Sequence, residues 1–404
     1  MSGDMPGGTQ MSQVGLVSQQ ERTEKGTPIL ELKDLHVDFH TYAGEVKALN
    51  GINLTLYKGE VVGLVGESGC GKSVTAAAVV GLLPENGKVT SGEIVFLGEN
   101  LLTKSRKEVR ELRSTRIAMV FQDPMTFLNP VLTIGEQLRE VFNLNSQKLA
   151  QAALDYDLRQ LKEEEANASD DAKRSEIRAR ISHLEGERAN PRVPRGRHKR
   201  KVLDSLASEA LNRMRVPDSD RIIKEFPHEL SGGMRQRVMI AMAIARDPDL
   251  LIADEITTAL DVTIQAQILE LLKILRREFN STILIITHDL GVVADLCDRV
   301  AVMYAGDVVE IADAEGLYAK PLHPYAQGLL RAVPKLTANP AMLESIPGSV
   351  PDLIYPPPAC RFNPRCPYAW DLCRQKKPEL IEVEKDHMTA CHLYTEGAKR
   401  QTHS

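Results

Sequence analysis

Apolar residues along the chain fall into short runs separated by polar turns. The first clear pair of runs predicts two short strands broken at Lys58 and Gly59, with apolar positions at Leu54, Leu56, Val61, Val62, Leu64 and Val65. The Ala-rich segment VTAAAVVGLL, directly after Ser73, has the character of a buried helix. Another apolar run, at residues 249–254, begins as a buried strand. Strands followed by helices in this way predict an α/β domain.

The middle of the chain has the periodicity of helices. Apolar residues recur there at i, i+4 and i+7 in two series: Leu154, Leu158, Leu161 and then Ile177, Ile181, Leu184. The polar segment ANASDDA separates the two series. The pattern predicts a charged helical hairpin inserted at about residues 145–201. The insertion ends in RANPRVPRGRHKRK, which contains no acid. Such a segment could touch anionic lipid head groups, but a solvated loop is the commoner outcome and the one we expect.

Composition and charge restrict the class of protein. The chain has 404 residues, 43% of them hydrophobic, which is enough for a large core or two domains. Its net charge of −5 provides no global basic field for nucleic acid. No apolar run approaches the roughly 18 residues of a membrane span, and the N-terminus lacks a signal-peptide pattern. We therefore expect a soluble cytoplasmic protein, with a disordered tail over residues 1–25, which are rich in Gly, Ser, Gln and Thr.

The segment GLVGESGCGKSVT, which joins the second strand to the helix, is suited to bind phosphate. Gly66, Gly69 and Gly71 allow successive backbone amides to approach an anion. Lys72 would reach the outer phosphates, and Ser73 offers a hydroxyl to magnesium at a helix N-terminus. The match to GxxxxGK[ST] has no gaps, and its strand–loop–helix context predicts a nucleotide site.

Two adjacent carboxylates, Asp254 and Glu255, end the buried strand at residues 249–254. In a phosphate-binding α/β domain, a strand-end aspartate orders magnesium and its waters. The following glutamate can orient or deprotonate an attacking water. The pair therefore predicts that the nucleotide is hydrolysed and not only bound.

Three further segments resemble those of ATP-binding cassette (ABC) ATPases. HELSGGMRQRV (residues 228–238) is similar to the family signature, VFQDP (120–124) to its Q-loop and LIITHDL (284–290) to its switch-histidine strand. These segments, the phosphate loop and the carboxylate pair follow one another in the family's order, and the resemblance covers about residues 29–334. It implies an α/β fold of the P-loop NTPase class, with a RecA-like core, a helical subdomain and here a C-terminal cysteine-bearing extension. The implied boundaries are an ABC ATPase domain at 26–320, its helical subdomain at about 123–245, and the extension at 321–404.

The resemblance also implies a role for each matching residue. Glu255 would be the catalytic base, His288 would contact the γ-phosphate, and Gln122 would contact magnesium and the water. Magnesium would be held by Ser73, Gln122 and Asp254. The residues implied to bind ATP are Phe39, Gly66, Ser68, Gly69, Gly71, Lys72, Ser73, Val74, Gln122, Asp254, Ser231, Gly232, Gly233 and Asp261. Phe39 would stack on the adenine, with Tyr42 as second choice.

A single chain is expected to hold only half of an ATP site. Ser231 and Gly233 begin a helix whose N-terminus presents free N–H groups and a positive dipole to an anion. In the family that anion is the γ-phosphate bound to another subunit. Ala259, Leu260 and Asp261 would form the turn that communicates across the interface. ATP would thus stabilise closure of two subunits, and hydrolysis would release them.

One position departs from the family pattern. Ile256 follows Glu255 where the family usually has proline. Proline fixes φ, so isoleucine would either loosen the turn that carries Glu255 and attenuate hydrolysis, or have no effect. No catalytic atom is missing.

The C-terminal segment resembles that of ATPase subunits from dipeptide and oligopeptide importers. PLHPYAQGLLRAVP (residues 321–334) and LESIPGSVP carry this resemblance, much of which nickel and glutathione importers share. Four cysteines follow, with five, six and seventeen residues between them: Cys360, Cys366, Cys373 and Cys391. Clustered cysteines in a cytoplasmic chain indicate a metal more than disulfides, and four thiolates suit zinc or an iron–sulfur cluster.

The resemblance favours a 4Fe–4S cluster at these cysteines, with Zn²⁺ and free thiols as the alternatives. His387 and His392 flank the last cysteine and are second-choice ligands. Cys70 and Cys297 lie outside the set and are expected to be plain small residues.

The resemblance as a whole implies an ATP- and Mg²⁺-dependent importer ATPase, peripheral on the cytoplasmic face of a bacterial inner membrane. Its partners would be two transmembrane permease subunits, a second ATPase subunit of different sequence and an extracytoplasmic peptide-binding protein, with no nucleic acid. The permease contact would lie between Gln122 and about Glu140. The alternatives are a nickel or glutathione importer ATPase, a weakly hydrolysing regulatory partner, or a soluble ABC ATPase of DNA repair.

Overall fold

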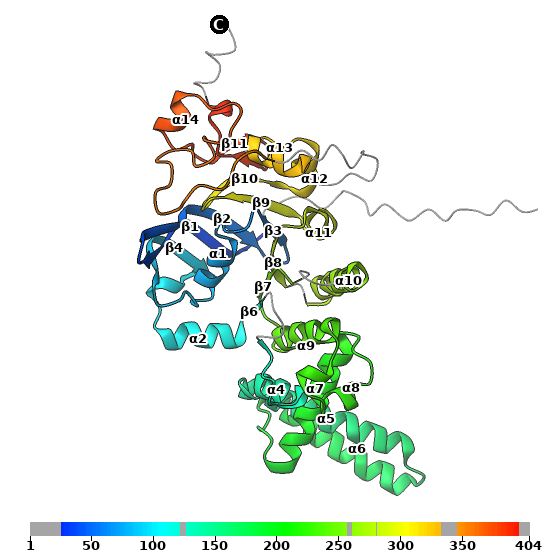
Figure 1. Cartoon of the computed structure of the whole chain (residues 1–404). Coiled ribbons are helices and arrows are strands. Elements are labelled where there is room, and N and C mark those ends of the chain that lie inside the picture. Colours follow the sequence, from blue (N-terminus) through cyan, green and yellow to red (C-terminus); the bar gives the residue numbers. More distant parts are fainter. Residues whose placement is uncertain (1–25, 122–126, 257–260, 280, 333–345, 396–404) are drawn as a thin grey trace, which may run out of the picture.

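The chain folds around two β-sheets, with a separate group of helices at one end (Figure 1). The structure is a computed structural model that describes residues 26–121, 127–256, 261–279, 281–332 and 346–395. The first sheet is antiparallel and has the strand order β2-β1-β4-β5. Its strands are β1 (Pro28–Thr41), β2 (Gly44–Tyr57), β4 (Gly87–Phe96) and β5 (Glu99–Asn100). The strand predicted around Leu54 and Leu56 is therefore the end of a long hairpin strand.

The second sheet runs through the whole α/β part and continues into the C-terminal region. Its strand order is β11-β12-β10-β9-β3-β8-β7-β6, and the strands from β9 to β6 are parallel. The strands are β3 (Val61–Val65), β6 (Ile117–Val120), β7 (Leu250–Asp254), β8 (Thr282–Thr287), β9 (Arg299–Tyr304), β10 (Asp307–Asp313), β11 (Ile381–Glu384) and β12 (His387–Thr389). Because β3, β8 and β7 are parallel neighbours, the segments that follow them meet at one end of the sheet.

Alternate residues of the central strands belong to two different cores. In β3, Val61 and Val65 face a core shared with helices α9–α13, whereas Val62 and Leu64 face a core shared with the first sheet and α1. Strands buried on both faces explain the continuous apolar runs in the sequence. The helices are α1 (Lys72–Val79), α2 (Arg106–Thr115), α4 (Ile134–Asn143), α5 (Ser146–Asn167), α6 (Asp171–Gly186), α7 (Gly196–Arg213), α8 (Ser219–Ile222), α9 (Gly232–Ile244), α10 (Val262–Phe279), α11 (Leu290–Leu296), α12 (Ala314–Ala319), α13 (Pro324–Arg331) and α14 (Asp371–Gln375).

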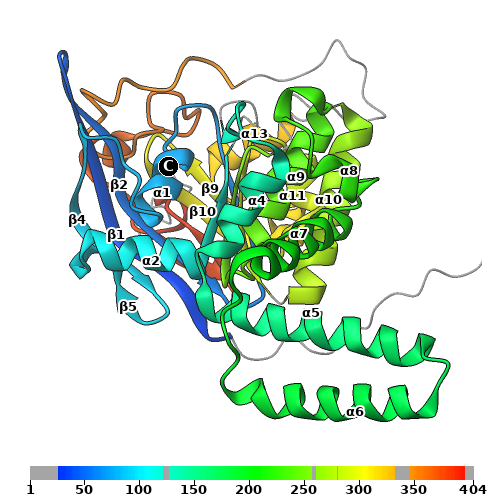
Figure 2. The same cartoon turned by 90° about the horizontal axis from the view of Figure 1, so that it is seen from below.

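Helices α5 and α6 lie side by side and project from the helical end of the molecule (Figure 2). They share a small apolar core of their own, formed by Leu154, Leu158, Leu161, Ala168, Ile177 and Ile181. Burial of each large aliphatic side chain contributes about 1.5–3 kcal/mol, which is enough to hold such a pair of helices together. The basic run that ends this segment is largely exposed, but residues 197–201 form the first turns of α7 and not a loop. In the described part of the chain, no helix has the length and apolar character needed to cross a membrane.

The C-terminal extension is joined to the second sheet through Glu310 of β10. Strand β12 pairs with β10 and aligns Thr389 with Glu310, and β11 pairs with β12. The buried Glu310 carboxylate accepts hydrogen bonds from the backbone amides of Leu322 (2.9 Å) and His323 (2.6 Å) and lies 2.7 Å from His387 Nε2. One carboxylate therefore binds both the segment before α13 and strand β12.

We expect His323→Asn to weaken the acid sensitivity of this junction. Burial lowers the pKa of His323 to about 3, whereas histidine in an unfolded chain titrates near pH ~6.5. The unfolded state therefore binds the proton first, and stability is lost as pH falls from about 6.5 toward 3, by up to about 1.4 kcal/mol per pH unit. Protonation would also remove the Nδ1 acceptor that caps the Tyr325 amide at 3.0 Å.

Urea unfolding of both proteins at pH 7.5 and 5.5 measures this difference. Asparagine does not titrate and is itself a good N-cap, so the variant should lose less stability over this interval. The buried Glu310, whose pKa is raised by burial, is common to both proteins and cancels in the comparison. An equal loss in both proteins would contradict the prediction.

Candidate nucleotide site

The loop between β3 and α1 places a buried ammonium group beneath a turn of backbone. Lys72 Nζ donates hydrogen bonds to the carbonyls of Gly66 (2.9 Å) and Glu67 (3.0 Å), and its side chain is buried. Gly71 has φ +109°, and a Cβ at this position would lie 2.6 Å from Met303 Cε. The glycine is therefore required both for the backbone conformation and for the close approach to β9. A positive group under a loop at a helix N-terminus suits an anion.

The remaining predicted loop residues differ in their exposure. Ser68, Gly69 and Ser73 are exposed, whereas Gly66 and Gly71 are buried and Val74 is half-buried. Cys70 is buried, with its Sγ 3.8 Å from Lys72 Nζ, and burial raises the pKa of its thiol. The loop thus presents its polar and small residues outward above the ammonium.

The end of β7 brings a carboxylate to the loop. Ser73 Oγ donates a hydrogen bond to Asp254 Oδ1 at 3.2 Å, across the strand order β3-β8-β7. Burial raises the pKa of Asp254, and the hydrogen bond from Ser73 partly offsets this effect. A hydroxyl and a carboxylate side by side are oxygen donors of the kind that Mg²⁺ prefers. Two of the three predicted magnesium ligands are therefore adjacent, and the third, Gln122, lies outside the described residues.

The next residue, Glu255, faces the end of β8. Its backbone amide donates to the carbonyl of Ile286 (2.8 Å), and its Oε1 lies 3.4 Å from His288 Nδ1. Glu255 has φ +48°, an uncommon conformation for a residue other than glycine. Backbone strain of this kind is concentrated at functional sites. The structure thus brings together the two side chains assigned to the base and to the γ-phosphate contact.

Ile256 is held firmly where the family usually has proline. Its side chain is buried in the core that β7 shares with α9 and α10. Its carbonyl accepts a 2.7 Å hydrogen bond from Nε2 of the buried Gln236 in α9. Sequence reasoning did not single out Gln236, although it lies within the quoted signature segment. This bond ties the signature helix to the residue that directly follows Glu255.

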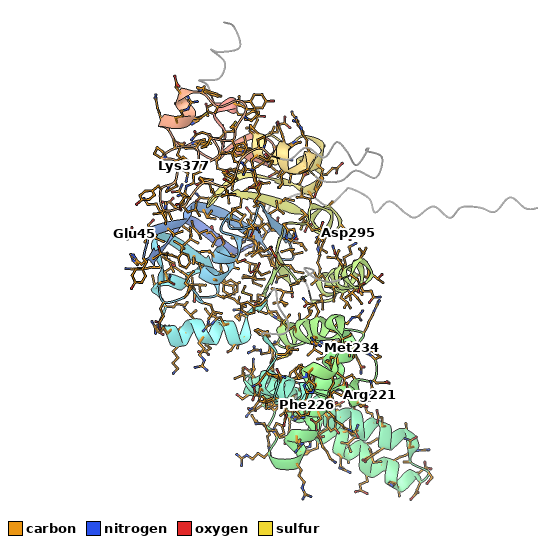
Figure 3. All side chains as sticks on the ribbon, in the orientation of Figure 1. Glu45, Arg221, Phe226, Met234, Asp295 and Lys377 are labelled. Carbon is orange, nitrogen blue, oxygen red and sulfur yellow. The ribbon has the colours of Figure 1, made fainter. Side chains whose placement is uncertain are left out.

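The signature residues form a helix start of their own. Ser231 Oγ caps α9 by accepting from the Met234 amide at 3.3 Å, and a Cβ at Gly233 would lie 2.9 Å from Ile264 Cγ2. Met234, in the first turn of α9, lies toward the helical end of the molecule (Figure 3). Among the described residues, no hydrogen bond joins residues 231–233 to Lys72 or Ser73. In Figure 1, α9 lies toward the helical end of the molecule, whereas α1 lies with the sheets.

The residues predicted to contact the partner subunit and the adenine differ in how the structure holds them. Asp261 Oδ1 accepts from the Ile264 amide at 2.9 Å and caps α10, whereas Ala259 and Leu260 lie outside the described residues. Phe39, near the end of β1, is half-buried, and its ring packs on Gly87, where a Cβ would lie 2.6 Å from it. Tyr42, at the hairpin turn, is fully exposed. Phe39 is thus held by the first sheet and is only partly buried.

The four cysteines converge, but they do not form an ion site. Burial, and also the other three thiols, raise the pKa of Cys391 to about 12. In the described residues, however, no group of three or more His, Cys, Asp or Glu side chains is arranged to hold a metal ion. His387 and His392 are engaged elsewhere, with Glu310 and with the carbonyl of Lys376. The iron–sulfur or zinc centre expected from the sequence is therefore not supported by this arrangement.

A glycine-rich loop with a buried lysine between a strand and a helix, together with a carboxylate pair at a neighbouring strand end, is typical of an ATPase of the P-loop class. The chain belongs to the ABC transporter family. The sequence model of that family matches residues 49–258. A second match, described as the C-terminal region of oligopeptide/dipeptide transporters, covers residues 309–373.

Named relatives and solved structures agree with this membership. The dipeptide transport ATP-binding protein DppD of Bacillus subtilis is 43% identical over 92% of this chain and 96% of its own. The oligopeptide transport ATP-binding protein OppD of Salmonella typhimurium is 43% identical over 90% of this chain and 93% of its own. The dimeric ATP-binding cassette MJ0796, bound to ADP and Pi, has a TM-score of 0.52 at 25% identity and covers 71% of this chain and 99% of that one.

Proposed function

We propose that the chain is the ATP-hydrolysing subunit of an importer of dipeptides or oligopeptides. The observation that carries the proposal is the joint match of residues 49–258 to ABC transporters and of residues 309–373 to the oligopeptide/dipeptide C-terminal region. Two relatives that align over nine-tenths of the chain are named for dipeptide and oligopeptide transport. The geometry described above provides the ATPase half of this function.

In this proposal, the phosphate loop and Lys72 bind the β- and γ-phosphates of ATP, and Phe39 stacks on the adenine. Ser73 and Asp254, 3.2 Å apart, would hold Mg²⁺ together with Gln122. Magnesium, when bound, neutralises charge on the phosphates. Glu255 accepts a proton from the attacking water, and His288, 3.4 Å away, contacts the γ-phosphate.

The second half of each ATP site would come from another ATPase subunit. The N-terminus of α9 carries Ser231, Gly232 and Gly233, which have no hydrogen bond to Lys72 or Ser73 of the described chain, and free amides at a helix start bind anions. In this proposal, the surface at the start of α9 binds the γ-phosphate of the ATP that is held by the phosphate loop of the partner subunit. ATP then favours closure, and loss of the γ-phosphate favours opening.

The assembly proposed around this subunit consists of two transmembrane permease subunits, a second ATPase and an extracytoplasmic peptide-binding protein. The subunit would lie peripherally on the cytoplasmic face of a bacterial inner membrane. Helix α4, which follows the Q-loop segment in the sequence, would face the permeases, while the cysteine-bearing extension lies at the opposite end of the molecule (Figure 1).

The test is reconstitution of the full chain with its permease subunits and binding protein, followed by measurement of phosphate release. We expect release to rise when the binding protein carries a dipeptide or oligopeptide. Stimulation by nickel or glutathione instead would assign the subunit to those importers. Salt-sensitive retention of DNA with no response to any of these solutes would favour a DNA-repair ATPase.

A 4Fe–4S cluster at Cys360, Cys366, Cys373 and Cys391 is the second part of the proposal. Its support is the chemistry of the donors, since four cysteine thiolates are the ligand set that iron–sulfur clusters use. Anaerobic purification should yield about four iron and four sulfide per chain. Cys366→Ser should lower both, and Cys297→Ser, at a buried cysteine outside the set, should not.

A further inference from the structure

The C-terminal extension binds directly to Glu67, the second residue of the phosphate loop. The Glu67 amide donates a 2.9 Å hydrogen bond to the hydroxyl of Tyr325 in α13. The Glu67 carboxylate accepts two hydrogen bonds from Arg365, from Nη1 to Oε2 at 2.7 Å and from Nη2 to Oε1 at 3.1 Å. Both the backbone and the side chain of one loop residue are thus held by residues about 260–300 positions away in the sequence.

Arg365 is also held by groups other than Glu67. Its Nε donates to the carbonyl of Pro347 (2.9 Å), and its Nη2 also donates to the carbonyl of Ile346 (3.1 Å). The guanidinium lies 5.7 Å from the centre of the Tyr304 ring, and the side chain is only 6% exposed. A two-pronged arginine–carboxylate pair is among the strongest and most directional side-chain interactions. The pair with Glu67 is therefore a rigid contact and differs from a loose surface ion pair.

The same loop residue supports the ammonium group of the site. The Glu67 carbonyl accepts from Lys72 Nζ at 3.0 Å and from the Cys70 amide at 3.3 Å. The Cys70 carbonyl in turn accepts from the Gly306 amide at 2.8 Å. A shift of Glu67 would therefore move the carbonyl that positions Lys72 and the turn that lies above it.

We propose that Arg365 and Tyr325 are positioning residues for ATP, and that the extension sets the ATP affinity of the phosphate loop through Glu67. The inference rests on the proposed ATP site. Because coupling between two sites is reciprocal, ATP binding also stabilises the docked extension. Arg365 lies between Cys360 and Cys366 in the sequence, so the conformation of the cysteine-bearing segment is linked to nucleotide binding.

Titration of the full-length chain with a fluorescent ATP analogue in the presence of Mg²⁺ tests the proposal. We expect Arg365→Gln to raise the Kd roughly fivefold or more. The rise should be smaller for Arg365→Lys, which keeps the charge but cannot donate two parallel hydrogen bonds to the Glu67 carboxylate. Tyr325→Phe should also raise the Kd. The matched control is Arg374→Gln, which breaks an exposed pair with Asp371 (3.0 Å) in the same extension and should leave the Kd unchanged.

A double-mutant cycle with Glu67→Gln separates positioning from general stability. If the two residues act as a pair, Arg365→Gln adds little to the Kd already raised by Glu67→Gln. In the assembled importer, the KM for ATP should rise more than kcat falls.

A lower Tm with an unchanged Kd in Arg365→Gln, Arg365→Lys and Tyr325→Phe would overturn the inference. If Arg365→Gln does not fold, the other two variants decide. Failure of the unmodified chain to bind the analogue would instead refute the proposed ATP site.

Discussion

Replacing Glu255 with glutamine is expected to slow ATP hydrolysis by roughly 10²- to 10⁴-fold, the usual contribution of a positioned general base. Glutamine has nearly the same shape but cannot accept a proton from water. ATP binding should persist, because Lys72 and the loop amides are untouched. The strained backbone at Glu255 (φ +48°) and its 3.4 Å approach to His288 support the assignment.

Phosphate release and ATP binding, measured on the same preparation, decide this prediction. The control is Glu270→Gln, which neutralises an exposed glutamate on α10, a helix that starts close to the same site. We expect this variant to hydrolyse ATP at the normal rate. If the Glu255 variant retained more than about half of the activity, the water would be activated by another group, because loss of a general base costs far more.

Replacing Gly66 with alanine should abolish tight ATP binding and also lower stability. A Cβ at this position would lie 2.1 Å from the carbonyl oxygen of Met303 in β9 and 2.8 Å from Cys70 Sγ. The first contact is with backbone, so no change of rotamer relieves it and the loop must move away from the sheet. We expect the free energy of unfolding to fall by about 1–3 kcal/mol. The Kd for ATP should rise more than roughly tenfold, because misplaced amides no longer converge on the phosphates.

Thermal unfolding with and without ATP, together with a binding titration, tests this second prediction. Gly186→Ala is a suitable control, because a Cβ there meets no atom within 4 Å at the end of helix α6. That variant should be as stable as the unmodified chain or slightly more stable, since alanine favours helix. Normal ATP affinity in Gly66→Ala would show that the loop tolerates displacement from β9.

The chemistry of the site could be predicted from sequence because its parts are local. The spacing of Gly66, Gly71 and Lys72 is enough to predict one phosphate loop. The adjacent Asp254 and Glu255 are enough to predict one strand end with two carboxylates. Their meeting follows from the rule that parallel strands carry ligands at their carboxyl ends. The 3.2 Å contact between Ser73 and Asp254 supports that part of the reasoning. The ABC fold inferred from the motifs is confirmed by the family match and by the solved cassettes.

The extension could not be predicted in the same way. Glu67 and Arg365 are separated by 298 positions, and no periodicity or local motif relates an acid in one loop to an arginine in another. Tyr325 lies in the segment PLHPYAQGLLRAVP, which the sequence analysis singled out. The contact of its hydroxyl with Glu67 of the phosphate loop could not be predicted from that segment. The spacing of the cysteines likewise shows four possible ligands without showing whether they reach one centre. These contacts depend on how the C-terminal extension packs on the rest of the chain. Part of that packing comes from β12 and β11, which continue the second sheet beyond β10.

The pairing of β12 with β10 also has a consequence for the behaviour of shortened chains. Without residues 381–389, β10 would expose a row of unpaired amide and carbonyl groups along an open sheet edge. Glu310 would lose its contact with His387. Uncovered edges of this kind are templates for intermolecular strand addition and aggregation. A truncated ATPase domain is thus expected to self-associate, so the extension contributes to solubility as well as to the contacts with the phosphate loop.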